Sequence, residues 1–342
     1  MRLNSQFSTW AGKMKAIQIR STGGPEVLEY VDLPDPQPGP ADAIVRAEVI
    51  GVGKPDVMIR TGVYPWMPSL PAIPGNEMVG VVEALGPDAG RVQVGQRVLV
   101  SSRELSTRGG CYAERICVPA ASLFLLPQSV DPLMAVSMGN YQLAMGMLFD
   151  SGSAPPRSIV VQSAAGGVGI ALVQSAAAHG IQVIAVGGTE EKCAYIKSAG
   201  AHYVHLRGSG DLREAVQAIT AGRGVDMVFD HIGGSGFVAQ LDLLAARGTL
   251  LSYNVLQGIP QENMVAELRR RLDRSVAIRS YSIHVLDHDP VRRRELMQTV
   301  IDLLGESRIR PPMPQSFPLR SAQEAHRLLD GPALLGKIVL VP

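Results

Sequence analysis

The chain has 342 residues and a formal net charge of +1 at pH 7. Two domains are the natural expectation at this length, and the balanced charge excludes a broad basic surface for nucleic acid or for an anionic membrane. Three cysteines form neither a disulfide framework nor a spaced metal cluster, which is typical of a reducing compartment. No apolar run is long enough to span a membrane, and residues 1–13 lack the apolar core of a secretory signal, so we expect a cytoplasmic protein.

The first part of the chain is rich in β-type residues. Short runs at 15–19, 43–50, 79–85 and 97–100 alternate with proline and glycine, and the segment 34–40 contains four prolines. These patterns predict strands that are separated by irregular connections. We therefore expect a β-rich domain here rather than a nucleotide-binding fold.

A strand, a glycine-rich turn and a helix follow one another in the middle of the chain. Residues 159–161 are β-branched, as is typical of a parallel strand buried on both faces. Ala164, Gly166 and Gly169 then have the A-x-G-x-x-G spacing of a dinucleotide-binding fingerprint (164–169). Glycine at 166 lets backbone N–H groups approach a pyrophosphate, and glycine at 169 lets the following helix pack closely on the strand. A second predicted strand at 181–186 supplies the expected context.

The same strand–helix alternation continues beyond the fingerprint. Helices are predicted at 190–198, 211–220 and 235–246, and strands at 200–204, 225–230, 249–253 and 276–281. This alternation predicts a parallel sheet with right-handed crossovers. The last strand, 337–341, has no crossover partner, so we expect it to return to the first domain. We therefore predict an α/β protein in which 1–131 and 282–342 form the β-rich domain and 132–281 the dinucleotide-binding domain.

Four further motifs accompany the fingerprint. They are Leu-Pro-Ala-Ile-Pro-Gly-Asn-Glu-Met-Val-Gly-Val-Val at 70–82, Gly-Gly-Cys-Tyr-Ala-Glu at 109–114, Val-Asp-Met-Val-Phe-Asp at 225–230 and Gly-Lys-Ile-Val-Leu at 336–340. Through them the chain resembles the zinc-free medium-chain dehydrogenase/reductases, the superfamily of quinone oxidoreductases and enoyl-thioester reductases. The resemblance covers 14–342 and implies a Rossmann doubly wound parallel sheet plus a β-rich, GroES-like catalytic domain.

The zinc ligands of zinc-dependent relatives are missing from this chain. Those relatives carry a cysteine shortly after the strand that ends here near Gly51, where this chain has Gly-Lys-Pro-Asp at 53–56. Their histidine in a Gly-His-Glu motif is replaced by Asn76. A catalytic zinc needs three protein ligands and an open position. The resemblance therefore implies a protein without a metal site.

The segment after the second strand favours NADPH over NADH. An NAD enzyme places an acidic residue at the end of that strand to hold the ribose hydroxyls, whereas this strand is followed by Gly188 and Thr189. The resemblance to quinone reductases implies that Thr189 and Lys192 bind the 2′-phosphate and that Arg207 lies near it. Alternatively, Thr189 is only a helix cap, Lys192 is solvated, and Glu190 mimics the ribose-binding acid. The predicted cofactor site also contains Gly167, Val168, Asn254 and Lys337.

Without a metal, conjugated compounds are the most suitable hydride acceptors. A quinone or an α,β-unsaturated carbonyl spreads the developing charge and needs only a hydrogen-bond donor. Tyr64 matches the tyrosine that is thought to donate the proton in enoyl-thioester reductases, and its hydroxyl, with a pKa of about 10, is a neutral donor at pH 7. The structural alternative is a partly buried tyrosine beside prolines. Asn140 is expected to contact the nicotinamide or the substrate, unless it only caps the helix that follows.

Three functions remain open. The first is an NADPH-dependent reductase of quinones or enones, with the substrate bound in a cleft between the two domains. The second is a 2-enoyl-thioester (enoyl-CoA or acyl-carrier) reductase. The third is a weakly catalytic NADPH-binding protein that also binds RNA through the arginines at 269–271 and 292–294, although solvated helix faces explain these clusters more simply. We expect a small-molecule substrate, neither nucleic acid nor membrane as a partner, and a homodimer through the edge strand near 276–281.

Overall fold

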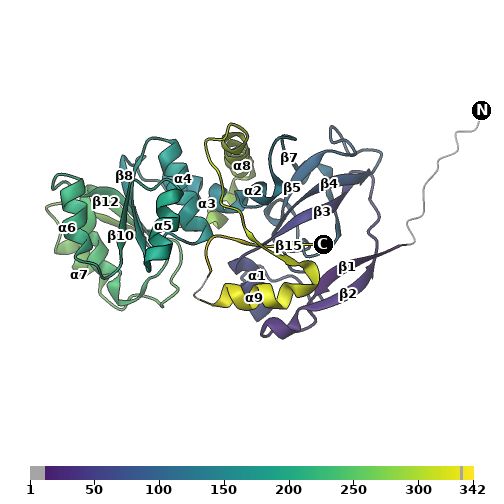
Figure 1. Ribbon diagram of the computed structural model, residues 1–342, viewed down its shortest axis with the longest axis horizontal. Coiled ribbons are helices and arrows are strands. Elements are labelled where there is room, and N and C mark those ends of the chain that lie inside the picture. The colour runs from purple at the N-terminus through teal and green to yellow at the C-terminus, as the bar shows by residue number, and fades with distance from the viewer. Residues whose placement is uncertain (1–11, 332–333) are drawn as a thin grey trace, which may run out of the picture. The chain divides into compact units, whose positions relative to one another are not determined.

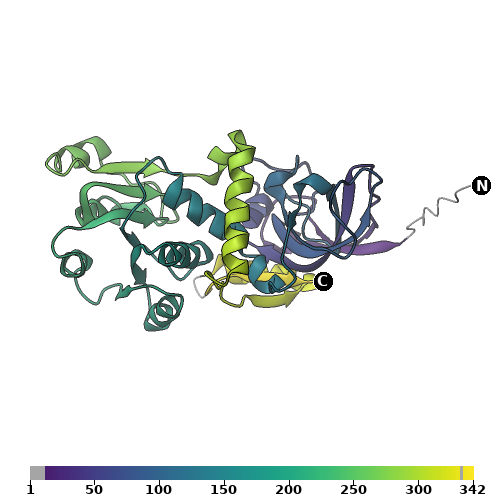
Figure 2. The same cartoon turned by 90° about the horizontal axis from the view of Figure 1, so that it is seen from above.

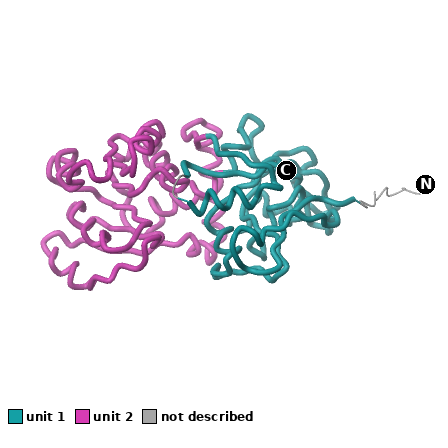
Figure 3. The backbone as a smooth tube through the Cα atoms, turned by 60° about the horizontal axis from the view of Figure 1, so that its bottom comes forward, with its two compact units in different colours: residues 1–136, 313–342 teal, residues 137–312 magenta. Residues whose placement is uncertain are grey.

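The computed structural model describes residues 12–331 and 334–342, so residues 1–11 of the predicted N-terminal extension lie outside the described part. The chain divides into two compact units, which Figure 3 colours teal and magenta. Unit 1 comprises 1–136 and 313–342, and unit 2 comprises 137–312. Over the described ranges, no helix has both the length and the apolar character needed to cross a membrane.

Unit 1 is built around a seven-stranded sheet in the order β14-β15-β3-β4-β5-β7, with β6 paired to β3. The strand β3 (Asp42–Val52) is buried along most of its length because it pairs with β4, β6 and β15. The predicted return of the last strand is confirmed, since β15 (Ile338–Val341) runs antiparallel to β3 with Ile338 opposite Val52. The other elements of unit 1 are β1 (Lys13–Gln18), β2 (Glu29–Pro34), α1 (Lys54–Thr61), β4 (Glu77–Leu85), β5 (Arg97–Ser101), β6 (Arg115–Pro119), β7 (Phe124–Leu125), α2 (Pro132–Ala135), β14 (Gln315–Pro318) and α9 (Ala322–Asp330).

Unit 2 contains a six-stranded sheet in the order β10-β9-β8-β11-β12-β13, in which every neighbouring pair is parallel. The predicted doubly wound Rossmann sheet is therefore confirmed. Figure 1 shows α4 and α5 on one face of the sheet and α6 and α7 on the other, as right-handed crossovers in opposite directions require. The elements are α3 (Met138–Phe149), β8 (Ser158–Val161), α4 (Gly167–Ala178), β9 (Gln182–Gly187), α5 (Glu190–Ser198), β10 (Tyr203–Leu206), α6 (Leu212–Ile219), β11 (Val225–Asp230), β12 (Leu244–Ser252), α7 (Met264–Arg269), β13 (Ala277–Ser280) and α8 (Pro290–Gly305).

Local sequence explains where several of these elements begin. All four residues of β8 are buried, because helices cover both faces of a parallel sheet. The helix α6 begins after Asp211, which is its N-cap because the carboxylate accepts the N–H of Arg213 at 2.8 Å. The prediction of one helix at 235–246 is wrong. The structure has two short 3-10 helices there, and β12 already begins at Leu244. Gly233, with φ +68°, has a conformation that glycine adopts most easily and that a regular helix does not contain.

The boundary between the units also differs from the predicted one. The structure assigns 282–312 to unit 2 rather than to the β-rich unit. The reason is α8, which packs beside α3 (Figure 2). Arg292 on α8 donates to both carboxylate oxygens of Asp150 at 2.8 and 3.1 Å, and Gln142 on α3 donates to the carbonyl of Arg293 at 2.7 Å. A helix pattern read from the sequence does not reveal which sheet the helix packs against.

Candidate active site

The fingerprint (164–169) connects β8 to α4, as its spacing predicts. Ser163 has a left-handed φ of +47°, and the N–H of Ala164 donates to the carbonyl of Val186 on β9 at 3.0 Å. A Cβ on Gly169 would lie 2.5 Å from the carbonyl oxygen of Ala164, so only glycine lets α4 approach the turn this closely. A Cβ on Gly166, by contrast, would meet no protein atom within 4 Å. The turn therefore leaves open space in front of α4.

The first turn of α4 provides the donors for an anion in that space. Gly166 is the N-cap, and Gly167 and Val168 follow it on the partly exposed start of the helix. The first helical bond is the one from the N–H of Ile170 to the carbonyl of Gly166, at 2.9 Å. The N–H groups before Ile170 have no partner within the helix, which is the arrangement that binds phosphates at helix N-termini. The residues present thus fit the pyrophosphate of a dinucleotide.

The end of β9 carries the residues predicted to read the 2′-phosphate. Gly188 and Thr189 are exposed, and Lys192 lies one turn later on α5. Thr189 caps α5, because its hydroxyl accepts the N–H of Lys192 at 3.2 Å. Helix capping by Thr189 is therefore confirmed. Its hydroxyl is still exposed, so the cap and a contact to a ribose phosphate are compatible.

Arg207 links the ends of three neighbouring strands. It follows β10, its N–H donates to the carbonyl of Gly187 on β9 at 2.8 Å, and its guanidinium donates to the hydroxyl of Ser163 after β8. The predicted residue therefore lies beside the fingerprint, with its positive charge at the carboxyl edge of the sheet. Asn254 follows β12 at the same edge, where its side chain accepts the N–H of Val255 at 2.8 Å.

Two residues that the sequence did not single out also lie at this edge. His231 directly follows β11, and its Nδ1 is 3.0 Å from the hydroxyl of Tyr253, which directly follows β12. Burial has the largest effect on the pKa of His231 and lowers it; the charge of Asp230 opposes this, and the charge of Arg207 lowers the pKa a little further. The signal that could have identified both positions is their place directly after predicted parallel strands, at the carboxyl edge of the sheet.

The remaining predicted residues lie on other elements. Lys337 belongs to unit 1, where its buried ammonium donates to the carboxylate of Glu77. Asn140 lies inside the first turn of α3, and the N-cap of that helix is Ser137, so the capping alternative for Asn140 is wrong. Tyr64 follows α1 in unit 1 and is 6% exposed.

Tyr64 is the candidate proton donor of unit 1. Its ring lies 5.7 Å from the ring of Trp66, centroid to centroid, and Trp66 is 42% exposed. The two rings form a small aromatic cluster between α1 and the strand β4 along the chain. Such packing restricts the orientation of the phenol. A group that donates a proton in catalysis needs a defined orientation of this kind.

A buried polar network in unit 1 includes Asn76 and the segment 53–56, the positions at which the resemblance implied that zinc ligands are missing. Asp56, on the first turn of α1, accepts the side-chain amide of Asn76 at 2.7 Å and the N–H of Gly53 at 2.8 Å. The amide oxygen of Asn76 in turn accepts the hydroxyl of Ser102 at 2.7 Å. Burial raises the pKa of Asp56 to about 6, although these hydrogen bonds oppose the rise.

These residues do not fit a catalytic zinc. The structure shows no group of three or more His, Cys, Asp or Glu side chains suited to a metal in the ranges it describes. Asn76 is held at both ends of its amide, and Glu77 is already paired with the ammonium of Lys337. No metal-dependent step can therefore be assigned to these residues.

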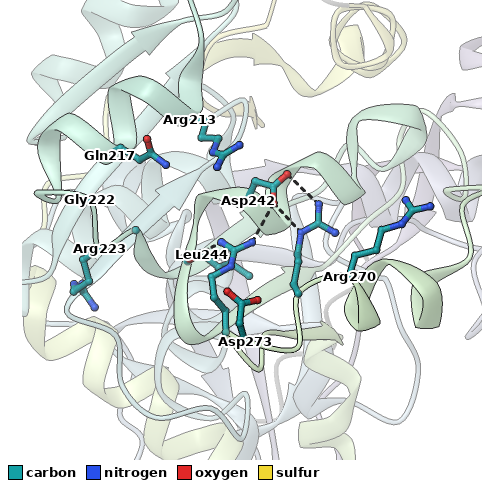
Figure 4. A pocket seen from close by; sticks show the side chains of 11 residues that line it. Arg213, Gln217, Gly222, Arg223, Asp242, Leu244, Arg270 and Asp273 are labelled. Carbon is teal, nitrogen blue, oxygen red and sulfur yellow. Dashed lines mark hydrogen bonds and ion pairs between the residues drawn. The ribbon is translucent and has the colours of Figure 1, made fainter.

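A polar pocket of about 490 Å³ lies elsewhere on unit 2, at the end of the sheet where β12 begins (Figure 4). Several arginines line it, but carboxylates hold them. Arg271 donates to both oxygens of Asp242 at 2.8 and 3.0 Å, and Arg274 donates to the same carboxylate at 3.1 Å. Arg271 also pairs with Glu267 at 3.0 Å. The pocket is thus at the opposite edge from the fingerprint, and much of its positive charge is compensated.

Comparisons with known proteins agree with this geometry. Residues 39–128 match the alcohol dehydrogenase GroES-like domain, and residues 167–304 match the zinc-binding dehydrogenase family. A quinone oxidoreductase from Pseudomonas aeruginosa is 30% identical over 334 residues, which cover 96% of this chain and 99% of that protein. A 2-haloacrylate reductase from Burkholderia sp. is 30% identical over 341 residues, with 96% and 98% covered. The crystal structure of Escherichia coli quinone oxidoreductase complexed with NADPH superimposes with a TM-score of 0.81 at 26% identity, and the match covers 96% of this chain and 100% of that one.

Proposed function

This chain belongs to the quinone-oxidoreductase-like medium-chain dehydrogenase/reductases, and from that premise we propose that it reduces quinones or other α,β-unsaturated carbonyl compounds with NADPH and without a metal. The observation that carries the proposal is the fingerprint, where Gly166 leaves open space in front of the unpaired N–H groups of α4. NADPH rather than NADH is supported by the absence of an acid at Gly188 and Thr189 and by the cations Lys192 and Arg207 nearby.

NADPH held at the fingerprint would supply a hydride, and one proton would still be needed to complete the reduction of the acceptor. Tyr64 is the proposed source of that proton. A phenol is neutral at pH 7 and donates a hydrogen bond to the acceptor oxygen as negative charge develops on it. When the proton is transferred, water restores it to the phenolate. Such a donor is most useful when its contribution is greatest in the transition state.

The polar network around Asp56 supports a reaction without a Lewis acid. Its residues stabilise one another and present no set of metal ligands. An alcohol or aldehyde substrate would need strong polarisation of a single oxygen. A quinone or enone delocalises the same charge over a conjugated system, so one neutral donor is sufficient. The chemistry of the residues therefore favours conjugated acceptors.

The alternatives can be ranked from the same observations. The similarity to 2-haloacrylate reductase adds unsaturated carboxylic acids to the acceptors that need testing. A 2-enoyl thioester shares the conjugated carbonyl and remains the second candidate. The RNA-binding alternative is weakened, because Arg271 and Arg292 are paired with Asp242 and Asp150. Charge that is already compensated contributes little to phosphate binding.

The proposal is tested by kinetics with one quinone, one enone and one enoyl thioester. Tyr64→Phe should lower enone turnover about 10²-fold or more, within the usual range for general acid catalysis, and leave NADPH affinity unchanged. A quinone is reduced more easily, so its turnover should fall less. Tyr30→Phe is the matched control, since Tyr30 lies on β2 in the same unit and is 44% exposed. Unchanged enone turnover in Tyr64→Phe would contradict the assigned role.

A further inference from the structure

The strand order in the sheet of unit 2 reverses between β8 and β11. Successive strands are added on one side of β8 as far as β10, and on the other side from β11 to β13. Ligands of open parallel sheets bind outside the carboxyl ends of the strands at such a reversal. Ser163 and the fingerprint follow β8, and His231 follows β11. The fingerprint and His231 therefore follow the two strands that flank the position where a dinucleotide is expected.

The loop that carries His231 is fixed by hydrogen bonds. The carboxylate of Asp230, at the end of β11, accepts the N–H of Ile232 at 3.0 Å, the N–H of Gly233 at 2.8 Å and the side-chain amide of Gln240 at 2.9 Å. The carbonyl of His231 itself accepts the N–H of Leu256 at 3.1 Å. The backbone of His231 is thus held from both sides, so its ring has a defined position.

Tyr253 holds the ring of His231 from the neighbouring strand. The two ring centroids are 5.3 Å apart, and the hydroxyl lies 3.0 Å from Nδ1. Burial raises the pKa of Tyr253, so the hydroxyl keeps its proton. A hydroxyl both donates and accepts. It can therefore donate to Nδ1 of the neutral imidazole, which leaves the N–H on Nε2, and accept from Nδ1 of the imidazolium.

The charged and titratable groups that face His231 come from three strands. Asp230 precedes it on β11, Arg207 follows β10, and Tyr253 follows β12. Burial outweighs the opposing charge of Asp230, and together with the smaller effect of Arg207 it lowers the pKa of His231 below its ordinary value of 6.5, so the free protein holds a neutral imidazole at pH 7. Asp230 favours the imidazolium, but its effect is smaller than that of burial, and its carboxylate also accepts two N–H groups of its own loop.

We propose that His231, positioned by Tyr253, is a cofactor-binding residue that takes up a proton from solvent when the phosphates of the dinucleotide arrive, so that cofactor affinity depends on pH. The inference rests on the proposed use of NADPH. An anion within a few ångströms favours the charged form of a histidine, and therefore raises its pKa in the complex. Affinity must then increase as pH falls from the pKa of the complex to that of the free protein, and level off below both.

The experiment is calorimetric binding of NADP⁺ between pH 5.5 and 8.0, in buffers of different ionisation enthalpy. NADP⁺ is the probe because the reduced form decomposes in acid. The ratio of the wild-type affinity to the His231→Gln affinity should be about tenfold larger at pH 5.5 than at pH 8. The wild type should also take up a proton when it binds NADP⁺. Glutamine keeps a polar partner for Tyr253 but cannot titrate. His202→Gln is the matched control, because His202 precedes β10 at the opposite edge of the sheet.

Each outcome has one meaning. Equal pH dependence in the wild type and in His231→Gln, with NADP⁺ bound at pH 8, overturns the inference and leaves the proposed function standing. No NADP⁺ binding at any pH overturns the proposed cofactor instead. Repeating the titration with NAD⁺ separates the phosphates, since an effect confined to NADP⁺ places His231 at the 2′-phosphate and a shared effect places it at the pyrophosphate. Tyr253→Phe provides a second variant, in which a looser ring should reduce the difference between acid and neutral pH; an unchanged difference would refute the role of Tyr253.

Discussion

Replacing Gly169 by alanine tests the close packing of α4 on the fingerprint. The added Cβ would lie 2.5 Å from the carbonyl oxygen and 2.7 Å from the carbonyl carbon of Ala164, and backbone atoms cannot rotate away as a flexible side chain can. Overpacking of this kind costs about 1–3 kcal/mol, and the higher helix propensity of alanine offsets up to about 1 kcal/mol. A domain of this size loses about 2–4 °C of melting temperature per kcal/mol, so the expected loss is several degrees. NADPH affinity should fall as well, because the helix must move away from the turn.

Gly166→Ala is the matched control, since it adds the same methyl group three residues earlier. Its backbone, with φ −79° and ψ 169°, suits alanine, and the new Cβ meets no protein atom within 4 Å. Stability should therefore change by no more than about 0.5 kcal/mol. NADPH affinity should nevertheless fall about tenfold or more, equivalent to about 1.4 kcal/mol, because the new methyl group occupies the space in front of α4 where the phosphates are expected. Thermal unfolding without cofactor and fluorescence titration with NADPH measure the two effects. A Gly169→Ala variant with wild-type stability, or a Gly166→Ala variant with wild-type affinity, would refute this reasoning.

Four further predictions concern the cofactor, pH, metal and assembly. Lys192→Ala should weaken NADPH binding by about 10- to 150-fold, which corresponds to a charge-assisted hydrogen bond of about 1.5–3 kcal/mol, and should leave NADH binding unchanged. Lys197→Ala, on the last turn of the same helix, is the control and should change the affinity for neither cofactor. An equal loss of affinity for both cofactors in Lys192→Ala would exclude a 2′-phosphate contact. Asp56 has a pKa of about 6 in the folded state and an ordinary value of 3.8, so the folded state binds the proton more tightly. The free energy of unfolding should therefore fall by about 3 kcal/mol as pH rises from about 4 to 6. Denaturant unfolding of Asp56→Asn should lack this slope, and a slope shared by both proteins would assign it to other groups. Elemental analysis should find less than one zinc per chain, and chelators should leave activity intact; tight zinc with activity lost on chelation is the contrary result. Light scattering at micromolar concentration should show a dimer, because β13 (Ala277–Ser280) is the outermost strand of its sheet, and a monomer would refute this assembly.

The nucleotide-binding half of the fold was predictable because its signals are local. The β-branched run before residue 162, the glycines at 166 and 169, and the apolar helix after them are consecutive in the chain. The close approach at Gly169 involves Ala164, five residues away. The same holds for Asp211 and Thr189, whose capping partners lie within three residues. Interactions of such short range leave a direct pattern in the sequence.

The sequence by itself therefore determined the α/β class, the parallel sheet, the return of the last strand and the position of the dinucleotide fingerprint. Tertiary structure alone decided which side chains meet. It paired Asp56 with Asn76, Lys337 with Glu77 and Arg207 with Ser163, and it brought His231 against Tyr253. The partners in these pairs are separated by 20, 260, 44 and 22 residues. Burial and charge compensation depend on how the strands are ordered and packed. They cannot be predicted from a sequence pattern, because contacts across a sheet have no fixed spacing along the chain.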